Sequence, residues 1–248
     1  MIWSPRTTGL WQTVWHERFN PCHIGRLRWA PKVETSAIGF EIGVEIGVEG
    51  ASFRDEGDGG LWVDVAMRAR RRVLACDRYL VVEGEVDRII VLADPGIDDF
   101  RNELFWSPER PTLNSATVSL YRCSGLVDRV ESCTALRSVH LLSERFMLNG
   151  RPCVLRLVLY QGYWPNTLVT APDDNALRCV VELAKEMGFN GVRKHQKIED
   201  PRYLYWADRL GLFVWAEMPS AYRFTRQAIQ RTVREGSEAI EREYGHRA

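Results

Sequence analysis

The strongest constraint on the fold is a change of hydrophobic rhythm near Phe146. Before this residue, apolar side chains recur at every second position, as they do in half-buried β-strands. After it, short apolar runs alternate with stretches in which apolar residues recur every three or four positions, as in amphipathic helices. The sequence therefore predicts an antiparallel β-sandwich followed by β/α units.

The clearest strand covers residues 38–48, where Ile, Phe and Val alternate with small or acidic residues. Shorter alternating stretches occur at 61–67, 117–121 and 137–141. Groups of Gly, Asp and Pro lie between these stretches and predict turns. Several short strands separated in this way are typical of a sandwich.

The second part begins with Asn149-Gly150, a strong hairpin signal, which we expect to join residues 146–148 to the apolar run 153–159. Three helices then have recognisable ends. The expected starts are Thr170-Ala-Pro-Asp173, Asp200-Pro201 and Thr225, and the expected ends are Gly188, Gly211 and Gly245. Apolar residues in 189–195 and 212–217 predict the intervening strands.

This order of strands and helices implies parallel strands joined by right-handed crossovers. A closed β/α barrel needs eight such units and typically about 250 residues. Only residues 140–248 are available for it, so we expect the first three units of a barrel that is cut off.

Composition excludes several functions. Lys and Arg (33) balance Asp and Glu (33), so no overall field favours nucleic acid or an anionic membrane. The sequence has neither a signal peptide nor an apolar run of membrane-spanning length, which predicts a cytoplasmic protein. The six cysteines form no C-x-x-C pair and are expected to be buried free thiols. Five singly scattered histidines predict no metal site. The sequence contains neither a G-x-x-x-x-G-K-[ST] phosphate loop nor a G-x-G-x-x-G motif after a strand, and we expect no cofactor.

Working residues of β/α barrels lie at the carboxyl ends of the strands. Arg193 and His195 end one predicted strand and Glu217 ends the next, and together they suit the binding of a polyol. Trp164, after the first strand, is expected to add an aromatic wall. Two plainer interpretations stay open: a structural Arg193–Glu217 salt bridge, and a surface or capping role for His195.

Six segments resemble glycoside hydrolase family 2, which contains β-galactosidases, β-glucuronidases and β-mannosidases. They are Gly9-Leu-Trp-Gln-Thr-Val-Trp15, Leu104-Phe-Trp-Ser-Pro-Glu-Arg-Pro-Thr-Leu113, Phe146-Met-Leu-Asn-Gly-Arg-Pro152, Gln161-Gly-Tyr-Trp-Pro165, Glu186-Met-Gly-Phe-Asn-Gly-Val-Arg-Lys-His195 and Leu210-Gly-Leu-Phe-Val-Trp-Ala-Glu-Met-Pro219. They follow one another in the family's order over nearly the whole chain.

The resemblance implies three parts. Residues 1–19 would contain the last strand or strands of a jelly-roll sugar-binding domain, 20–139 an immunoglobulin-like β-sandwich, and 140–248 the N-terminal part of a TIM-barrel catalytic domain. Arg193 and His195 match an element that lines the sugar pocket, and Glu217 matches an acidic pocket or supporting residue.

The family hydrolyses β-glycosides with retention, using one glutamate as acid/base and one as nucleophile. By the resemblance, both glutamates would follow later strands, so no catalytic residue is assigned in residues 1–248. The complete protein is expected to be a glycosidase and the isolated chain to be inactive. Two alternatives remain, namely a non-catalytic carbohydrate-binding or interaction module, for which the Trp-rich sandwich is the candidate, and a non-functional gene remnant.

Overall fold

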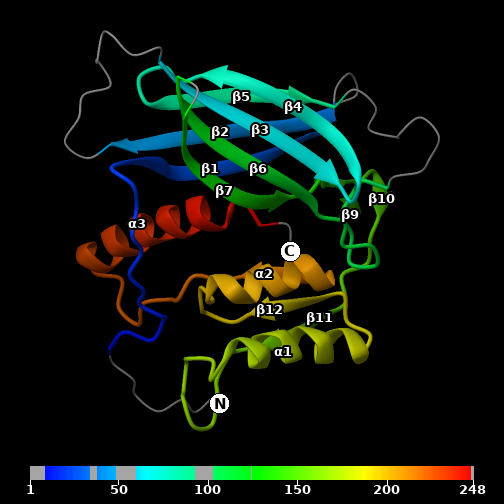
Figure 1. The fold of residues 1–248 in the computed structure, drawn as a ribbon. Coiled ribbons are helices and arrows are strands. Elements are labelled where there is room, and N and C mark those ends of the chain that lie inside the picture. Colours follow the sequence, from blue (N-terminus) through cyan, green and yellow to red (C-terminus); the bar gives the residue numbers. More distant parts are fainter. Residues whose placement is uncertain (1–8, 34–37, 49–59, 93–102, 124, 247–248) are drawn as a thin grey trace. The chain divides into compact units, whose positions relative to one another are not determined.

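The structure, a computed structural model, describes residues 9–33, 38–48, 60–92, 103–123 and 125–246 (Figure 1). The chain divides into two compact units. One contains Glu17–Cys153, and the other contains the segment up to His16 together with Val154–His246. We call them the sheet unit and the strand–helix unit. The predicted boundary at residues 139/140 lies before this division.

Two antiparallel sheets make up most of the sheet unit (Figure 1). One has the order β1 (Cys22–Val33), β2 (Ile38–Val48), β5 (Glu85–Val91), and the other has the order β4 (Arg72–Leu80), β3 (Leu61–Ala69), β6 (Asn114–Arg122), β7 (Gly125–Thr134). Alternate residues of both sheets enter one hydrophobic core, for example Phe40 and Ile42 of β2 and Val63 and Val65 of β3, all 0% exposed. The predicted strands at 38–48, 61–67 and 117–121 are confirmed.

A third small sheet follows in the order β10 (Arg151–Pro152), β9 (Arg145–Leu148), β8 (Val139–Leu142). Asn149 and Gly150 form its turn with φ values of 50° and 74°, as the Asn-Gly signal predicted. The predicted partner strand was wrong beyond Pro152, because residues 157–160 pair with a parallel strand instead. A hairpin signal sets the turn but does not set the length of the second strand.

The strand–helix unit contains a parallel sheet in the order β11 (Leu157–Tyr160), β12 (Gly191–Lys194), β13 (Phe213–Ala216). Helix α1 (Asp174–Glu186) connects the first two strands, α2 (Pro201–Leu210) connects the next two, and α3 (Arg226–Glu243) follows β13. The predicted alternation of strands and helices is confirmed.

Each helix begins at a capping residue within its predicted starting segment, although the cap of α1 is Asp173 and not Thr170 at the start of that segment. The Asp173 carboxylate accepts the Ala176 N–H at 2.7 Å and caps α1. Asp200 caps α2, Pro201 occupies its first turn, and Gly211 ends it in the left-handed region with φ of 78°. Thr225 caps α3.

One face of the parallel sheet packs against α1 and α2. Its core consists of Leu177, Val181, Ala184, Val192, Tyr203, Leu204, Ala207 and Leu212. Strand alternation turns Leu159, Arg193 and Trp215, which are paired in register, to the opposite face, where Leu159 and Trp215 are 50% and 58% exposed. Helix α3 has no buried residue, so the apolar stripe predicted for it lies exposed in this structure.

Residues 9–21 form no strand and join no sheet of the described residues, so the strand expected within residues 1–19 stays a prediction. The prediction for the cysteines differs in part from the structure. None of the six cysteines, all within the described residues, forms a disulfide, but none is buried either: three are exposed and three are intermediate. Their scattered spacing excluded a disulfide framework without indicating burial.

Candidate functional site

Three of the four predicted site residues meet at the ends of β12 and β13. Arg193 Nε donates to Glu217 Oε1 at 2.6 Å, and His195 Nδ1 lies 3.2 Å from Glu217 Oε2. The backbone N–H of His195 also donates to the Tyr160 carbonyl at 3.2 Å, which fixes it at the end of the sheet. We call Arg193, His195 and Glu217 the strand-end trio.

The trio is accessible to solvent and holds a carboxylate in its ionised form. The hydrogen bond from the Arg193 guanidinium has the largest effect on the pKa of Glu217 and lowers it. Burial opposes this change, and His195 and the Gln196 backbone N–H lower the pKa further. The side chains of Arg193 and His195 remain 51% and 31% exposed. This arrangement offers a cation, an imidazole and a carboxylate to a polar ligand.

Trp164 lies in the loop after β11, where its backbone forms two hydrogen bonds with Leu168, at 2.6 and 2.9 Å. It is partly buried, and its indole N–H has no hydrogen-bond partner within the described residues. Within the described residues no hydrogen bond or ring contact joins it to the trio, so its role as an aromatic wall stays a prediction.

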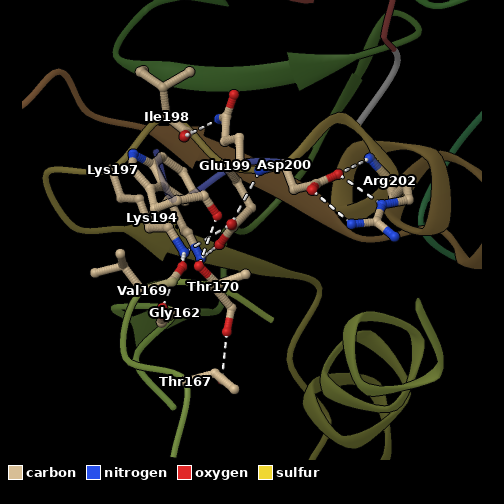
Figure 2. Close-up of polar contacts among 12 residues, drawn as sticks. Gly162, Thr167, Val169, Thr170, Lys194, Lys197, Ile198, Glu199, Asp200 and Arg202 are labelled. Carbon is tan, nitrogen blue, oxygen red and sulfur yellow. Dashed lines mark hydrogen bonds and ion pairs between the residues drawn. The ribbon is translucent and has the colours of Figure 1, made fainter. Parts of the chain in front are cut away.

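Beside the trio lies a buried ionic cluster that the sequence analysis missed. It consists of Lys194, Lys197 and Glu199, whose side chains are 0%, 9% and 4% exposed (Figure 2). Lys194 forms an ion pair with Glu199 Oε2, and Lys197 Nζ lies 2.8 Å from Glu199 Oε1. A K-x-x-K-x-E stretch normally indicates a solvated loop, because lysine and glutamate are rarely buried unless they are paired.

The lysines of this cluster differ in their surroundings. Strand alternation turns Lys194 to the helix side, where its ammonium lies 3.6 Å from the Tyr160 ring centroid and 5.0 Å from that of Tyr203. Burial lowers the pKa of Lys194 from 10.5 to about 8, although the Glu199 carboxylate opposes this change. Burial likewise raises the pKa of Tyr160 and Tyr203.

A hollow of about 970 Å³ is lined by residues that neighbour the trio in sequence, such as Gln196 and Met218, but by none of the trio itself. Its walls come from residues 9–14, from the turn after β12, from Met218 and Pro219 after Glu217, and from one side of α3. Trp11 and Lys197 both line it, and Lys197 Nζ lies 4.7 Å from the centroid of a Trp11 ring. The hollow therefore combines an aromatic ring with charged groups beside the strand ends.

No helix among the described residues is long and apolar enough to cross a membrane. No group of three or more His, Cys, Asp or Glu side chains in the same residues is arranged to hold a metal ion.

Comparison with known proteins places this geometry in context. No protein-family model matches the sequence. A β-galactosidase of Thermoanaerobacter pseudethanolicus is 24% identical over 213 residues, which cover 85% of this chain and 27% of that protein. β-Galactosidase 2 of Enterobacter cloacae is 32% identical over 110 residues, which cover 44% of this chain and 11% of that protein.

Solved structures share the fold. A glycosyl hydrolase family 2 member from Bacteroides cellulosilyticus aligns with a TM-score of 0.73 and 20% identity, covering 92% of this chain and 31% of that one. The β-glucuronidase of Parabacteroides merdae aligns with a TM-score of 0.75 and 14% identity, covering 91% and 27%. The chain spans less than a third of each of these four proteins. The sequence similarity and the shared fold together support the conclusion that this chain is related to glycoside hydrolase family 2.

Proposed function

We propose that residues 1–248 form part of a retaining β-glycosidase of the family 2 type and contribute to its sugar pocket. In this proposal the sheet unit is an immunoglobulin-like sandwich, and the strand–helix unit supplies the first three β/α units of a TIM barrel. Residues 1–19 are assigned to the end of a jelly-roll domain. The observation that carries the proposal is the Arg193–His195–Glu217 trio at the carboxyl ends of parallel strands.

The trio suits binding better than catalysis. A general acid needs a pKa near the working pH, whereas the pKa of Glu217 is lowered by Arg193 and His195. Retention also needs a second carboxyl group about 5 Å away across the scissile bond. We therefore assign Glu217, Arg193 and His195 to hydrogen bonding of sugar hydroxyls, Trp164 to stacking on the sugar, and both catalytic glutamates to parts of the protein outside this chain.

The alternative of a Trp-rich binding sandwich has less support. Two of the three tryptophans in the sheet unit, Trp29 and Trp106, are 4% and 0% exposed, so their rings face the protein interior and are not available to stack on a sugar. Only Trp62 is partly exposed, and a single ring does not make a Trp-rich binding surface. The remnant alternative predicts aggregation, and the exposed apolar residues Leu159 and Trp215 on the parallel sheet agree with that expectation.

Binding by the purified chain tests the proposal. Methyl β-D-galactopyranoside and methyl β-D-glucuronide would be titrated separately while NMR signals of the His195 ring and the Trp164 indole are followed. We expect saturable shifts with at least one probe, lost in Glu217→Gln and retained in Glu186→Gln, a control at the exposed end of α1. No shift with either probe, or shifts unaffected by Glu217→Gln, would refute the assignment.

Hydrolysis of the corresponding p-nitrophenyl glycosides tests the second half of the proposal. We expect no release of nitrophenol above background. Turnover that disappears in Glu217→Gln would instead make Glu217 a catalytic residue.

A further inference from the structure

The ammonium group of Lys197 makes three polar contacts, two with backbone carbonyls of the loop after β11 and one with the Glu199 carboxylate. It donates to the Gly162 carbonyl at 3.0 Å and to the Val169 carbonyl at 2.7 Å, and it pairs with Glu199 Oε1 at 2.8 Å (Figure 2). An ammonium has three donors, so these contacts account for all of them. With its side chain 9% exposed, little of this group is left to water.

The two carbonyl groups are the ends of one loop. Gly162 and Val169 flank the short Trp164–Leu168 turn, so a single ammonium holds both ends of the segment that carries Trp164. The fit at Gly162 is close: its φ is +66°, and a Cβ there would lie 2.9 Å from Lys197 Nζ and 2.6 Å from Glu199 Oε2. Displacement of the ammonium would release this loop.

The backbone of Lys197 is tied to the trio. Lys197 forms an isolated antiparallel bridge with Glu217, and it lies two residues after His195. Gln196, between them, has a left-handed φ of 46° and donates its backbone N–H to the Glu217 carboxylate. Lys197 thus joins the turn after β12, the end of β13 and the loop after β11.

The N-terminal segment Trp11–Thr13 packs on this junction. Its Trp11 ring faces Lys197 at 4.7 Å, and the Trp11 carbonyl accepts the Thr170 hydroxyl at 2.7 Å. Thr13 Oγ1 accepts a hydrogen bond from Arg202 at 3.0 Å. These contacts join residues more than 150 positions apart and explain why the segment belongs to the strand–helix unit.

We propose that Lys197 is a positioning residue for the sugar site. Its buried ammonium and its backbone set the Trp164 loop and Glu217 in one arrangement, and Trp11–Thr13 supports this arrangement by packing against Lys197 and Thr170. This inference rests on the proposed function for its consequence in binding, but its structural part can be tested without a sugar. It gives the segment before the sheet unit a direct part in the site.

Lys197→Met is the decisive variant, because it removes the ammonium and leaves Lys194 paired with Glu199. Lys32→Met is the matched control, since Lys32 pairs with Glu41 at 2.8 Å on the sheet unit and is 39% exposed. In the sugar-free protein we expect Lys197→Met to shift the indole N–H signals of Trp11 and Trp164 and the ring signals of His195. Lys32→Met should leave all three unchanged.

Sugar binding provides the second measurement. Lys197→Met should weaken the affinity for whichever methyl glycoside binds by about tenfold or more. The reason is that Trp164, His195 and Glu217, although unchanged themselves, would no longer be held in their positions. A lower melting temperature with unchanged His195 and Trp164 signals would mean that Lys197 only stabilises the fold, and the proposal would be wrong. If neither glycoside binds the wild-type chain, the proposed function fails, and the sugar-free spectra still decide the positioning role.

Trp11→Ala provides the same test should Lys197→Met not fold. Trp11 is only partly buried, and its loss leaves the Lys197–Glu199 pair in place. We expect shifted Trp164 and His195 signals. Signals identical to those of the wild-type chain would mean that Trp11–Thr13 takes no part in setting the Trp164 loop and Glu217, and the proposal as stated would be wrong.

Discussion

The buried cluster has one carboxylate, Glu199, for two lysines, Lys194 and Lys197. Substitution of Lys194 and substitution of Glu199 should therefore change the free energy of unfolding in opposite directions. The change of the Lys194 pKa from 10.5 to about 8 corresponds to about 3 kcal/mol of unfavourable free energy for keeping this side chain charged at neutral pH. Lys194→Met removes this cost and leaves Glu199 paired with Lys197 at 2.8 Å. Because Glu199 keeps its second lysine partner, we expect Lys194→Met to raise the free energy of unfolding at pH 7 by roughly 1–3 kcal/mol, up to the cost that the lowered pKa represents.

Glu199→Gln should do the reverse. It removes the carboxylate that both buried ammonium groups face, and breaking a buried pair in this way typically costs about 3–5 kcal/mol. The two variants thus change the same cluster by one charge each but move the stability in opposite directions. Urea unfolding at pH 7, followed by tryptophan fluorescence, measures both, with Lys32→Met as the exposed-lysine control.

The pH dependence provides an independent check. A lysine whose pKa is lower in the folded state binds fewer protons there, so its cost is fully present below about pH 8 and fades as the pH rises toward 10.5. Wild-type stability should therefore rise relative to Lys194→Met between pH 8 and 10. Above that range the raised pKa values of Tyr160 and Tyr203 act against the folded state. Parallel pH curves, or a Lys194→Met variant less stable than the wild type at pH 7, would refute the reasoning.

Three other substitutions test separate parts of the structure. Arg193→Gln should raise the pKa of Glu217 toward its ordinary value, measured by NMR titration of the carboxyl carbon, with little change in the urea midpoint because the pair is exposed; an unchanged pKa would contradict the assigned cause. Gly191→Ala should lower the free energy of unfolding by about 1–3 kcal/mol, since its Cβ would lie 2.8 Å from Phe213 Cβ; urea unfolding equal to that of the wild type would show that the strands can shift. Asp173→Ala should cost about 1 kcal/mol through loss of the α1 cap, detected as faster amide exchange in the first turn, and unchanged exchange there would count against the cap.

Local patterns predicted the elements of this fold because their determinants are local. Asp173 and Thr225 accept hydrogen bonds from backbone groups three residues away, and Gly211 adopts the left-handed conformation that ends its helix. Alternation in residues 38–48 specified which side chains enter the core of the sheet unit. The same rule of strand ends placed Arg193, His195 and Glu217 together, because the carboxyl ends of parallel strands share one edge.

Features that depend on distant segments could not be predicted in this way. The burial of Lys194 depends on Tyr160 and Tyr203, which come from β11 and α2, and on the turn that brings Glu199 back to the sheet. The contact of Trp11 with Lys197 joins two segments of the strand–helix unit that the sequence of the sheet unit, Glu17–Cys153, separates along the chain. The sequence around Lys194 gives no sign of its contacts with Tyr160 and Tyr203, and the sequence around Trp11 gives no sign of its contact with Lys197.

The adjacent residues Arg193 and Lys194 show how one strand can supply an exposed residue to the candidate site and a buried residue to the interior. Alternation sends Arg193 to the uncovered face, where a solvent-exposed ion pair contributes little to stability and remains available to a ligand. It sends Lys194 into the helix-covered face, where charge is costly but the surrounding contacts are fixed by packing. Substitutions of Arg193 should therefore alter the site more than the fold, and substitutions of Lys194 the fold more than the site. Lys197 lies after the strand, in contact with both regions, and for this reason its substitution should disturb them together.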